Sequence, residues 1–150
     1  MDNKTERIWE PHKSSLFNLD ANMMALLSFL AAAVLGWLPG VRYVAWLAPL
    51  LIFLVEKNSP LVKRCAIQAF MVQLACQAIS LALVIVVAFL TSFLGTAGLA
   101  LSGALSVLIA VVGIIFLVFE IIAMVKAYQY KEYNIPIIGK MADWLISHFM

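Results

Sequence analysis

Glu120 is the acidic residue of this chain whose position is most informative, because it lies inside the apolar segment FLVFEIIAMVK. A carboxylate in a membrane segment is costly to bury, so its presence suggests a proton or cation site. A structural interpretation competes with this one: Glu120 could pair with Lys63 or Arg64, or reach the cytoplasmic interface. We favour the structural interpretation, since the residue is near the end of its segment, where the penalty is smaller.

Amide and hydroxyl side chains recur in the preceding apolar segment. Gln73, Gln77 and Ser80 follow each other at i, i+4 and i+7, which places them on one face of a helix, and Gln68 precedes them. These groups must face protein or water rather than lipid. Because glutamine neither titrates nor attacks, hydrogen bonds between helices explain them better than a polar path does.

Residue patterns typical of catalysis are missing from the sequence. Both histidines, His12 and His148, lie in terminal segments, and there is no HExxH, GxSxG or phosphate-binding glycine loop. The two cysteines, Cys65 and Cys76, are eleven positions apart, too far along one straight helix for a disulfide. We therefore expect no enzymatic activity, no cofactor and no bound metal.

The composition is that of a membrane protein. Hydrophobic residues make up 65% and charged residues 12% of the 150 positions, and mean hydropathy is +1.02. No Asp, Glu, Lys or Arg occurs between Cys65 and Phe119. The net charge of +2 is too small, and its basic residues too scattered, for a nucleic-acid-binding surface.

The apolar runs predict a single all-α membrane domain with four transmembrane helices in two hairpins. The expected spans are residues 21–38, 41–55, 67–94 and 101–125. They are bounded by an N-terminal segment (1–20), a central elbow (56–66) and a tail (126–150). In the tail, one face of a predicted short helix on the membrane surface is formed at helical spacing by Met141, Trp144, Leu145, His148 and Phe149.

Charge placement predicts the orientation. Nine Lys and Arg residues, Lys63 and Arg64 among them, fall in the two terminal segments and the elbow, against Arg42 alone on the other side. The excess predicts a bacterial inner-membrane protein with both termini cytoplasmic. Two alternatives remain: a disfavoured signal peptide ending near Ala31–Ala33, and a re-entrant hairpin over residues 21–55, whose second run is short and contains Pro49.

Two segments resemble a known family. SPLVKRCAIQAF (residues 59–70) and AYQYKEYNIPIIGKMA (127–142) are similar to signatures of small four-helix bacterial membrane proteins of unknown function. This family is Tic-twenty-like, that is, related to a protein import component of the chloroplast inner envelope. The matching positions are Ser59, Pro60, Gln68, Ala69, Pro136 and Gly139. Cys65 stands where the family usually has histidine, and Tyr130 stands near its usual glycine.

The resemblance implies a non-enzymatic membrane protein that acts through helix packing and partner contacts, with a link to protein translocation or insertion. The expected partners are membrane lipid and either a second copy or another membrane protein. A small transporter or channel is the alternative, with its polar path along Gln73, Gln77, Ser80 and Glu120.

Overall fold

The structure, a computed structural model, describes residues 7–149, and this part of the chain is all-helical, as expected. Five α-helices follow in order: α1 (Ala21–Trp37), α2 (Leu47–Val55), α3 (Pro60–Leu94), α4 (Thr96–Tyr128) and α5 (Ile138–Phe149). A 3₁₀ turn, Val41–Val44, joins α1 to α2, so the predicted second span is not one continuous helix.

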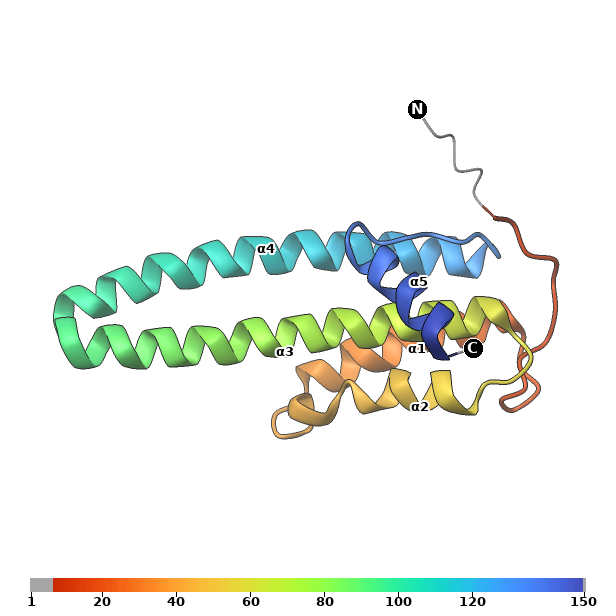
Figure 1. The fold of residues 1–150 in the computed structure, drawn as a ribbon, viewed down its shortest axis with the longest axis horizontal. Helices are drawn as coiled ribbons and strands as arrows, with labels where there is room; N and C mark the ends of the chain where they lie inside the picture. The colour runs from red at the N-terminus through yellow and green to blue at the C-terminus, as the bar shows by residue number, and fades with distance from the viewer. Residues whose placement is uncertain (1–6, 150) are drawn as a thin grey trace, which may run out of the picture.

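The centre of the fold is a long antiparallel hairpin of α3 and α4 (Figure 1). Ser59 caps α3, because its Oγ accepts a hydrogen bond from the Val62 N–H at 3.2 Å, and Pro60 begins the helix. Gly95 alone makes the turn into α4, with φ +56°. Helix α4 therefore begins five residues before the predicted span, because the helix continues through the apolar residues after the turn.

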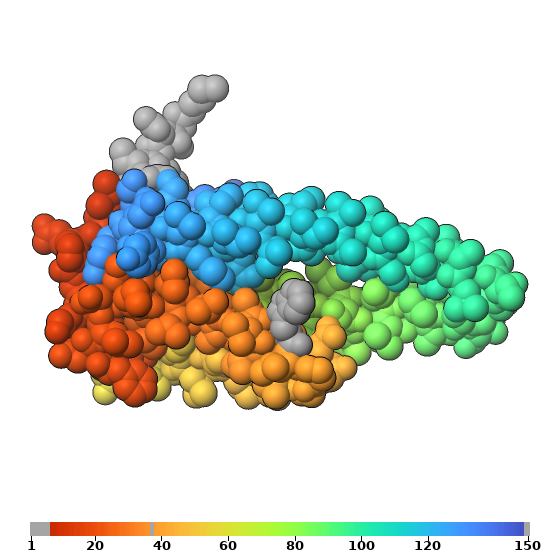
Figure 2. All heavy atoms as spheres, turned by 180° about the vertical axis from the view of Figure 1, so that it is seen from behind, coloured from red at the N-terminus to blue at the C-terminus, as the bar shows by residue number. Residues whose placement is uncertain are grey.

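Helices α1 and α2 pack along only the first half of α3 (Figures 1 and 2). Their connection reaches the level of Gln77, whose Nε2 donates to the Arg42 carbonyl. Gln77 is 17 residues after Pro60, about 26 Å along α3. Beyond it, α3 and α4 continue together as a two-helix extension, which we call the distal arm (residues 81–115).

The helices of the two hairpins differ in length. Within residues 7–149, α3 and α4 are long and apolar enough to cross a membrane by length and composition, whereas α1 and α2 are shorter. Four crossings therefore remain a prediction. Small residues permit the close approach of α1 to α3, since Ala25, Ala32, Ala66 and Ala69 are fully buried.

The polypeptide before α1 folds over the ends of the helices. The Trp9 N–H donates to the Tyr130 carbonyl at 2.9 Å, and the Ala21 N–H donates to the His12 carbonyl at 2.9 Å. Tyr130 has φ +58° directly after α4, and the Lys131 N–H bonds back to the Lys126 carbonyl, which ends the helix as a left-handed cap does. The chain ends with α5, which crosses α3 near its start (Figure 1).

Candidate functional site

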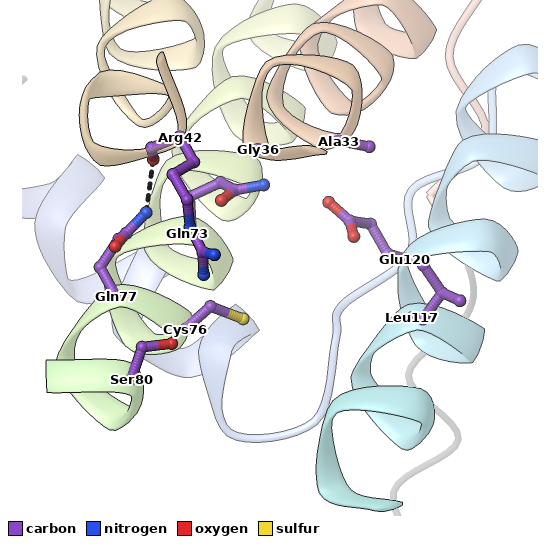
Figure 3. Close-up of a pocket in the computed structure, with 9 residues that line it drawn as sticks. All are labelled: Ala33, Gly36, Arg42, Gln73, Cys76, Gln77, Ser80, Leu117 and Glu120. Carbon is purple, nitrogen blue, oxygen red and sulfur yellow. Dashed lines mark hydrogen bonds between the residues drawn. The ribbon is translucent and has the colours of Figure 1, made fainter. Parts of the chain in front are cut away.

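A pocket of about 140 Å³ lies where α1, α3 and α4 meet the connection to α2 (Figure 3). Its lining is polar on the α3 side and includes the carboxylate from α4. The lining residues are Ala33, Gly36, Arg42, Gln73, Cys76, Gln77, Ser80, Leu117 and Glu120. The three polar residues predicted to share one face, Gln73, Gln77 and Ser80, thus come together with Glu120.

Glu120 is buried, with 5% of its surface exposed, and points into this pocket (Figure 3). Its Oε1 has no hydrogen-bond partner among the described residues. The expected ion pair with Lys63 or Arg64 is wrong for Arg64, which binds Glu132 and Asp143 instead. No ion pair of Glu120 with Lys63 is found among residues 7–149 either, so the carboxylate is available to a ligand of the pocket.

The side-chain amides of Gln73 and Gln77 both donate hydrogen bonds to backbone carbonyls. Gln73 Nε2 donates to the Ala32 carbonyl at 2.9 Å, and Gln77 Nε2 donates to the Arg42 carbonyl. These bonds tie α3 to α1 and to the connection, as the structural interpretation predicted. Gly36 makes room for the first amide, because a Cβ there would lie 3.3 Å from Gln73 Nε2. With the nitrogens engaged, the amide oxygens are left as acceptors.

The remaining polar groups stand at the open part of the pocket. Arg42 and Cys76 are both exposed, and the Arg42 guanidinium carbon lies 5.8 Å from the centre of the Tyr43 ring. The Arg42 side chain extends from the connection into the pocket, opposite Glu120 (Figure 3). The pocket therefore combines a guanidinium and a carboxyl group with neutral acceptors. No cluster of three or more His, Cys, Asp or Glu residues suited to a metal occurs within the described part of the chain.

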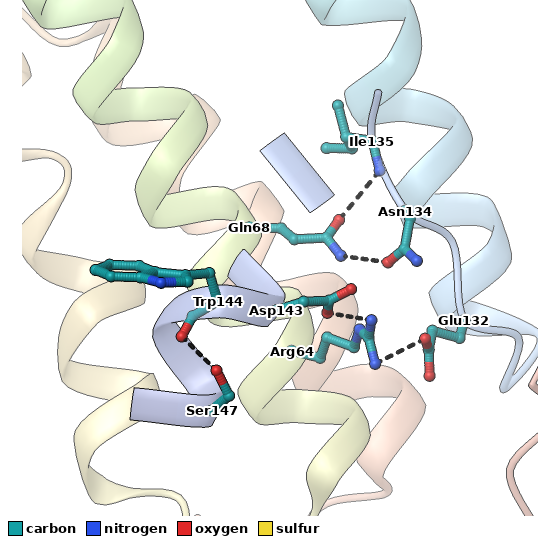
Figure 4. Close-up of polar contacts among 8 residues, drawn as sticks. All are labelled: Arg64, Gln68, Glu132, Asn134, Ile135, Asp143, Trp144 and Ser147. Carbon is teal, nitrogen blue, oxygen red and sulfur yellow. Dashed lines mark hydrogen bonds and ion pairs between the residues drawn. The ribbon is translucent and has the colours of Figure 1, made fainter. Parts of the chain in front are cut away.

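A second polar cluster lies outside the pocket and joins α3 to the C-terminal segment (Figure 4). Arg64 Nη1 lies 2.8 Å from Glu132 Oε1, and its Nη2 bonds to Asp143 on α5. Because the Glu132 side chain is only 10% exposed, this ion pair is largely shielded from water. Arg64, predicted as a cytoplasmic anchor, thus also holds the tail.

Gln68 belongs to this second cluster and not to the pocket. Its Nε2 donates to Asn134 Oδ1 at 3.2 Å, and its Oε1 accepts from the Ile135 N–H at 3.5 Å. Gly139 packs against the same asparagine, since a Cβ there would lie 2.8 Å from Asn134 Cβ. Ala69 lies in the core beside these groups. Gln68, Ala69 and Gly139, which belong to the two segments singled out in the sequence, therefore stabilise the packing of the tail against α3.

Sequence reasoning missed a third cluster, around Glu56 between α2 and α3. Its carboxylate accepts hydrogen bonds from the Ser14 hydroxyl, from the Ser15 N–H (3.0 Å) and hydroxyl (2.8 Å), and from the Ser59 N–H (3.0 Å). Burial alone would raise the pKa of Glu56, but these bonds outweigh it and lower the pKa to about 2. In the sequence, the adjacent hydroxyl residues Ser14 and Ser15 were the available signal for this cluster.

A comparison with protein families identifies the family of this chain. The model of the magnetosome magnetite crystal formation protein family matches residues 20–142. No curated protein and no solved structure matched the chain. The family match shows that the Tic-twenty-like assignment was wrong. Protein translocation, which was inferred only from that resemblance, and transport both lack support from this match.

Proposed function

Since the chain belongs to the magnetosome magnetite crystal formation protein family, we propose that it is a non-enzymatic membrane protein that contributes to magnetite crystal formation. The observation that carries the proposal is the match over residues 20–142, which includes α1 to α4 and the start of α5. The proposed location is the magnetosome membrane, with membrane lipid and other membrane proteins, or a second copy, as partners.

The shape of the fold supports an action through helix packing. The distal arm exposes large apolar side chains to its surroundings, Phe89 at 60% and Phe93 at 74% among them. Side chains of this kind suit lipid or another apolar helix. The polar side chains of Gln73, Gln77, Ser80 and Glu120, by contrast, line the pocket between the helices.

The proposed orientation keeps residues 7–20, the elbow and α5 on the cytoplasmic side. Lys63 and Arg64 lie at this end of the fold, and α5 buries Ile138 and Ala142 while exposing Met141 (50%) and Trp144 (62%). A helix with such an exposed apolar face suits the membrane surface. We therefore propose that α5 lies at the cytoplasmic interface.

Deletion of the gene in a magnetosome-forming bacterium tests the proposed role. We expect crystals of altered number or size in electron micrographs, restored by the wild-type gene. A variant that disrupts the α3–α4 hairpin, Gly98→Val, should fail to restore them, because a Cβ at Gly98 would lie 2.2 Å from the Leu90 carbonyl oxygen. The matched variant Gly103→Ala, at a glycine with open space around it, should restore them. Unchanged crystals after deletion would overturn the proposal.

A further inference from the structure

Residues 13–20 form a tight hairpin directly before α1. The Ser14 N–H donates to the Leu19 carbonyl at 2.8 Å, and the Leu19 N–H donates to the Leu16 carbonyl at 3.3 Å, which closes a four-residue turn. The two central residues of this turn, Phe17 and Asn18, both have φ +54°. Two positive φ values in succession are typical of a type I′ turn, which places Phe17 at the tip of the hairpin.

Phe17 is an unusual residue for this position. Asparagine adopts the left-handed region readily, but a bulky aromatic residue is strained there. The Phe17 side chain is 85% exposed, so packing within the fold does not offset this strain. The preceding Leu16, by contrast, packs against the buried cluster that contains Leu61 and Val62 of α3. The hairpin therefore holds one apolar side chain in the fold and presents the next one outward.

The exposed apolar surface of α2 ends close to this hairpin. Leu54 and Val55, the last residues of the helix, are 64% and 50% exposed, and the exposed Lys57 follows two positions later. In a membrane protein, such a change from exposed apolar to charged residues marks the boundary between the hydrocarbon core and the headgroups. In the proposed orientation, the cytoplasmic boundary thus lies at residues 55–57.

Hydrogen bonds hold the hairpin at the same boundary, beside the ends of α2 and α3 (Figure 1). The Ser14 hydroxyl donates to the Glu56 carboxylate, which also accepts from the Ser15 N–H at 3.0 Å. The Ser15 hydroxyl in turn accepts from the Lys57 N–H at 2.8 Å. We propose that Phe17 inserts into the lipid of the cytoplasmic leaflet and anchors the N-terminal hairpin there.

Lipid contact accounts for the strained position of Phe17. An aromatic ring at the boundary of headgroups and acyl chains buries apolar surface, and this burial offsets the cost of the left-handed backbone. The base of the hairpin carries little net charge, because the exposed Lys13 and Asp20 stand opposite each other. Apolar contact, rather than attraction to anionic lipid, therefore supplies the binding, and uncharged phosphatidylcholine bilayers suffice to test it.

Fluorescence of a single nitrobenzoxadiazole label measures the insertion in the purified full-length chain, placed in phosphatidylcholine nanodiscs. The label is attached to Phe17→Cys in a Cys65→Ser, Cys76→Ser background. We expect blue-shifted emission, quenching by lipids with nitroxide-labelled acyl chains, and several-fold protection from aqueous iodide. The matched control is Glu10→Cys, an exposed position outside the hairpin, where iodide should quench and nitroxide lipid should not.

Hydrogen exchange of unlabelled variants in the same nanodiscs separates insertion from turn geometry. Asparagine suits a left-handed backbone, so a hairpin that made no lipid contact would exchange more slowly in Phe17→Asn. Insertion predicts the reverse, because asparagine loses the apolar contact: exchange over residues 13–20 should be several-fold faster in Phe17→Asn. Phe17→Leu keeps an apolar side chain and should exchange at close to the wild-type rate.

Equal quenching by iodide at positions 17 and 10, or slower exchange in Phe17→Asn, would overturn the proposal. Protection from iodide without quenching by nitroxide lipid would also overturn it, because the label would then contact protein. The inference rests on the proposed membrane location, which a label at Val107→Cys, 65% exposed on the distal arm, tests separately. Quenching by nitroxide lipid at position 107 but not at position 17 would refute the insertion of Phe17 alone.

Discussion

Replacement of Glu56 by alanine should loosen the N-terminal segment from the helices. The carboxylate is 1% exposed and accepts five hydrogen bonds, from Ser14, Ser15 (two), Asn58 and Ser59. Alanine removes all five acceptor contacts at once. The segment that contains Ser14 and Ser15 then loses its main polar attachment to the elbow.

The expected loss of stability in Glu56→Ala depends on which of the hydrogen-bond donors to Glu56 water can reach after the substitution. Ser15 and Asn58 are exposed, so water can replace the carboxylate there, whereas Ser14 (3% exposed) and Ser59 (0%) are buried. Each buried donor left without a partner costs about 1–3 kcal/mol, so we expect Glu56→Ala to destabilise the protein by roughly 2–6 kcal/mol. Glu56→Gln keeps an acceptor oxygen and should lose less.

Denaturant unfolding in detergent and limited proteolysis of residues 7–20 measure this effect. Glu10→Ala is the matched control, because it removes the same atoms from an exposed side chain. The pKa of Glu56 is lowered from 4.5 to about 2, so its contribution is fully present above pH 4.5 and is lost as the pH falls toward 2. If Glu56→Ala unfolded within 0.5 kcal/mol of Glu10→Ala and kept its protease resistance, the reasoning would be refuted.

Two further pairs of variants test the packing of the long helices and of the tail. Gly98→Ala should destabilise the hairpin by about 1–3 kcal/mol through its contact with the Leu90 carbonyl, whereas Gly103→Ala should be neutral or stabilise by up to about 1 kcal/mol, both measured by denaturant unfolding. Arg64→Ala leaves the buried Glu132 unpaired and should speed hydrogen exchange in residues 131–149, with a loss of about 2–4 kcal/mol. Lys63→Ala, which removes a side chain with no ion pair among the described residues, should leave that exchange unchanged; equal effects of the two variants would contradict the role of Arg64.

Local sequence signals predicted the common face of Gln73, Gln77 and Ser80, because helical periodicity depends on neighbouring residues alone. The start of α4 could not be predicted as well. Residues 95–100 contain no charge or proline, and the tight turn depends on the contact of Gly98 with α3, which is a tertiary feature.

The pocket could be predicted only in part for a related reason. Glu120 stands out as a charge in an apolar run, but its neighbours Arg42 and Gly36 come from the first hairpin, and their approach depends on how deep that hairpin reaches. Glu56 was missed because a carboxylate in a polar loop is usually solvated, whereas here residues 14 and 15 fold over it.

The position along α3 that the connection between α1 and α2 reaches leads to a prediction about membrane topology. The charge-free part of α3 continues for 17 residues beyond Gln77, about 26 Å, and Gln77 is level with Arg42. If Arg42 lay at the far membrane surface, this apolar length would extend into water, which favours the alternative in which α1 and α2 form a re-entrant hairpin and only α3 and α4 cross.

Single cysteines in a Cys65→Ser, Cys76→Ser background distinguish the two topologies. A membrane-impermeant thiol reagent, applied from the side opposite the cytoplasm, should label Ser92→Cys near the end of the distal arm but not Val41→Cys in the connection. Both positions are exposed on the protein surface, so both should react once detergent removes the lipid. Labelling of both cysteines in intact membranes would instead establish four crossings, because only then does the connection between α1 and α2 emerge on that side.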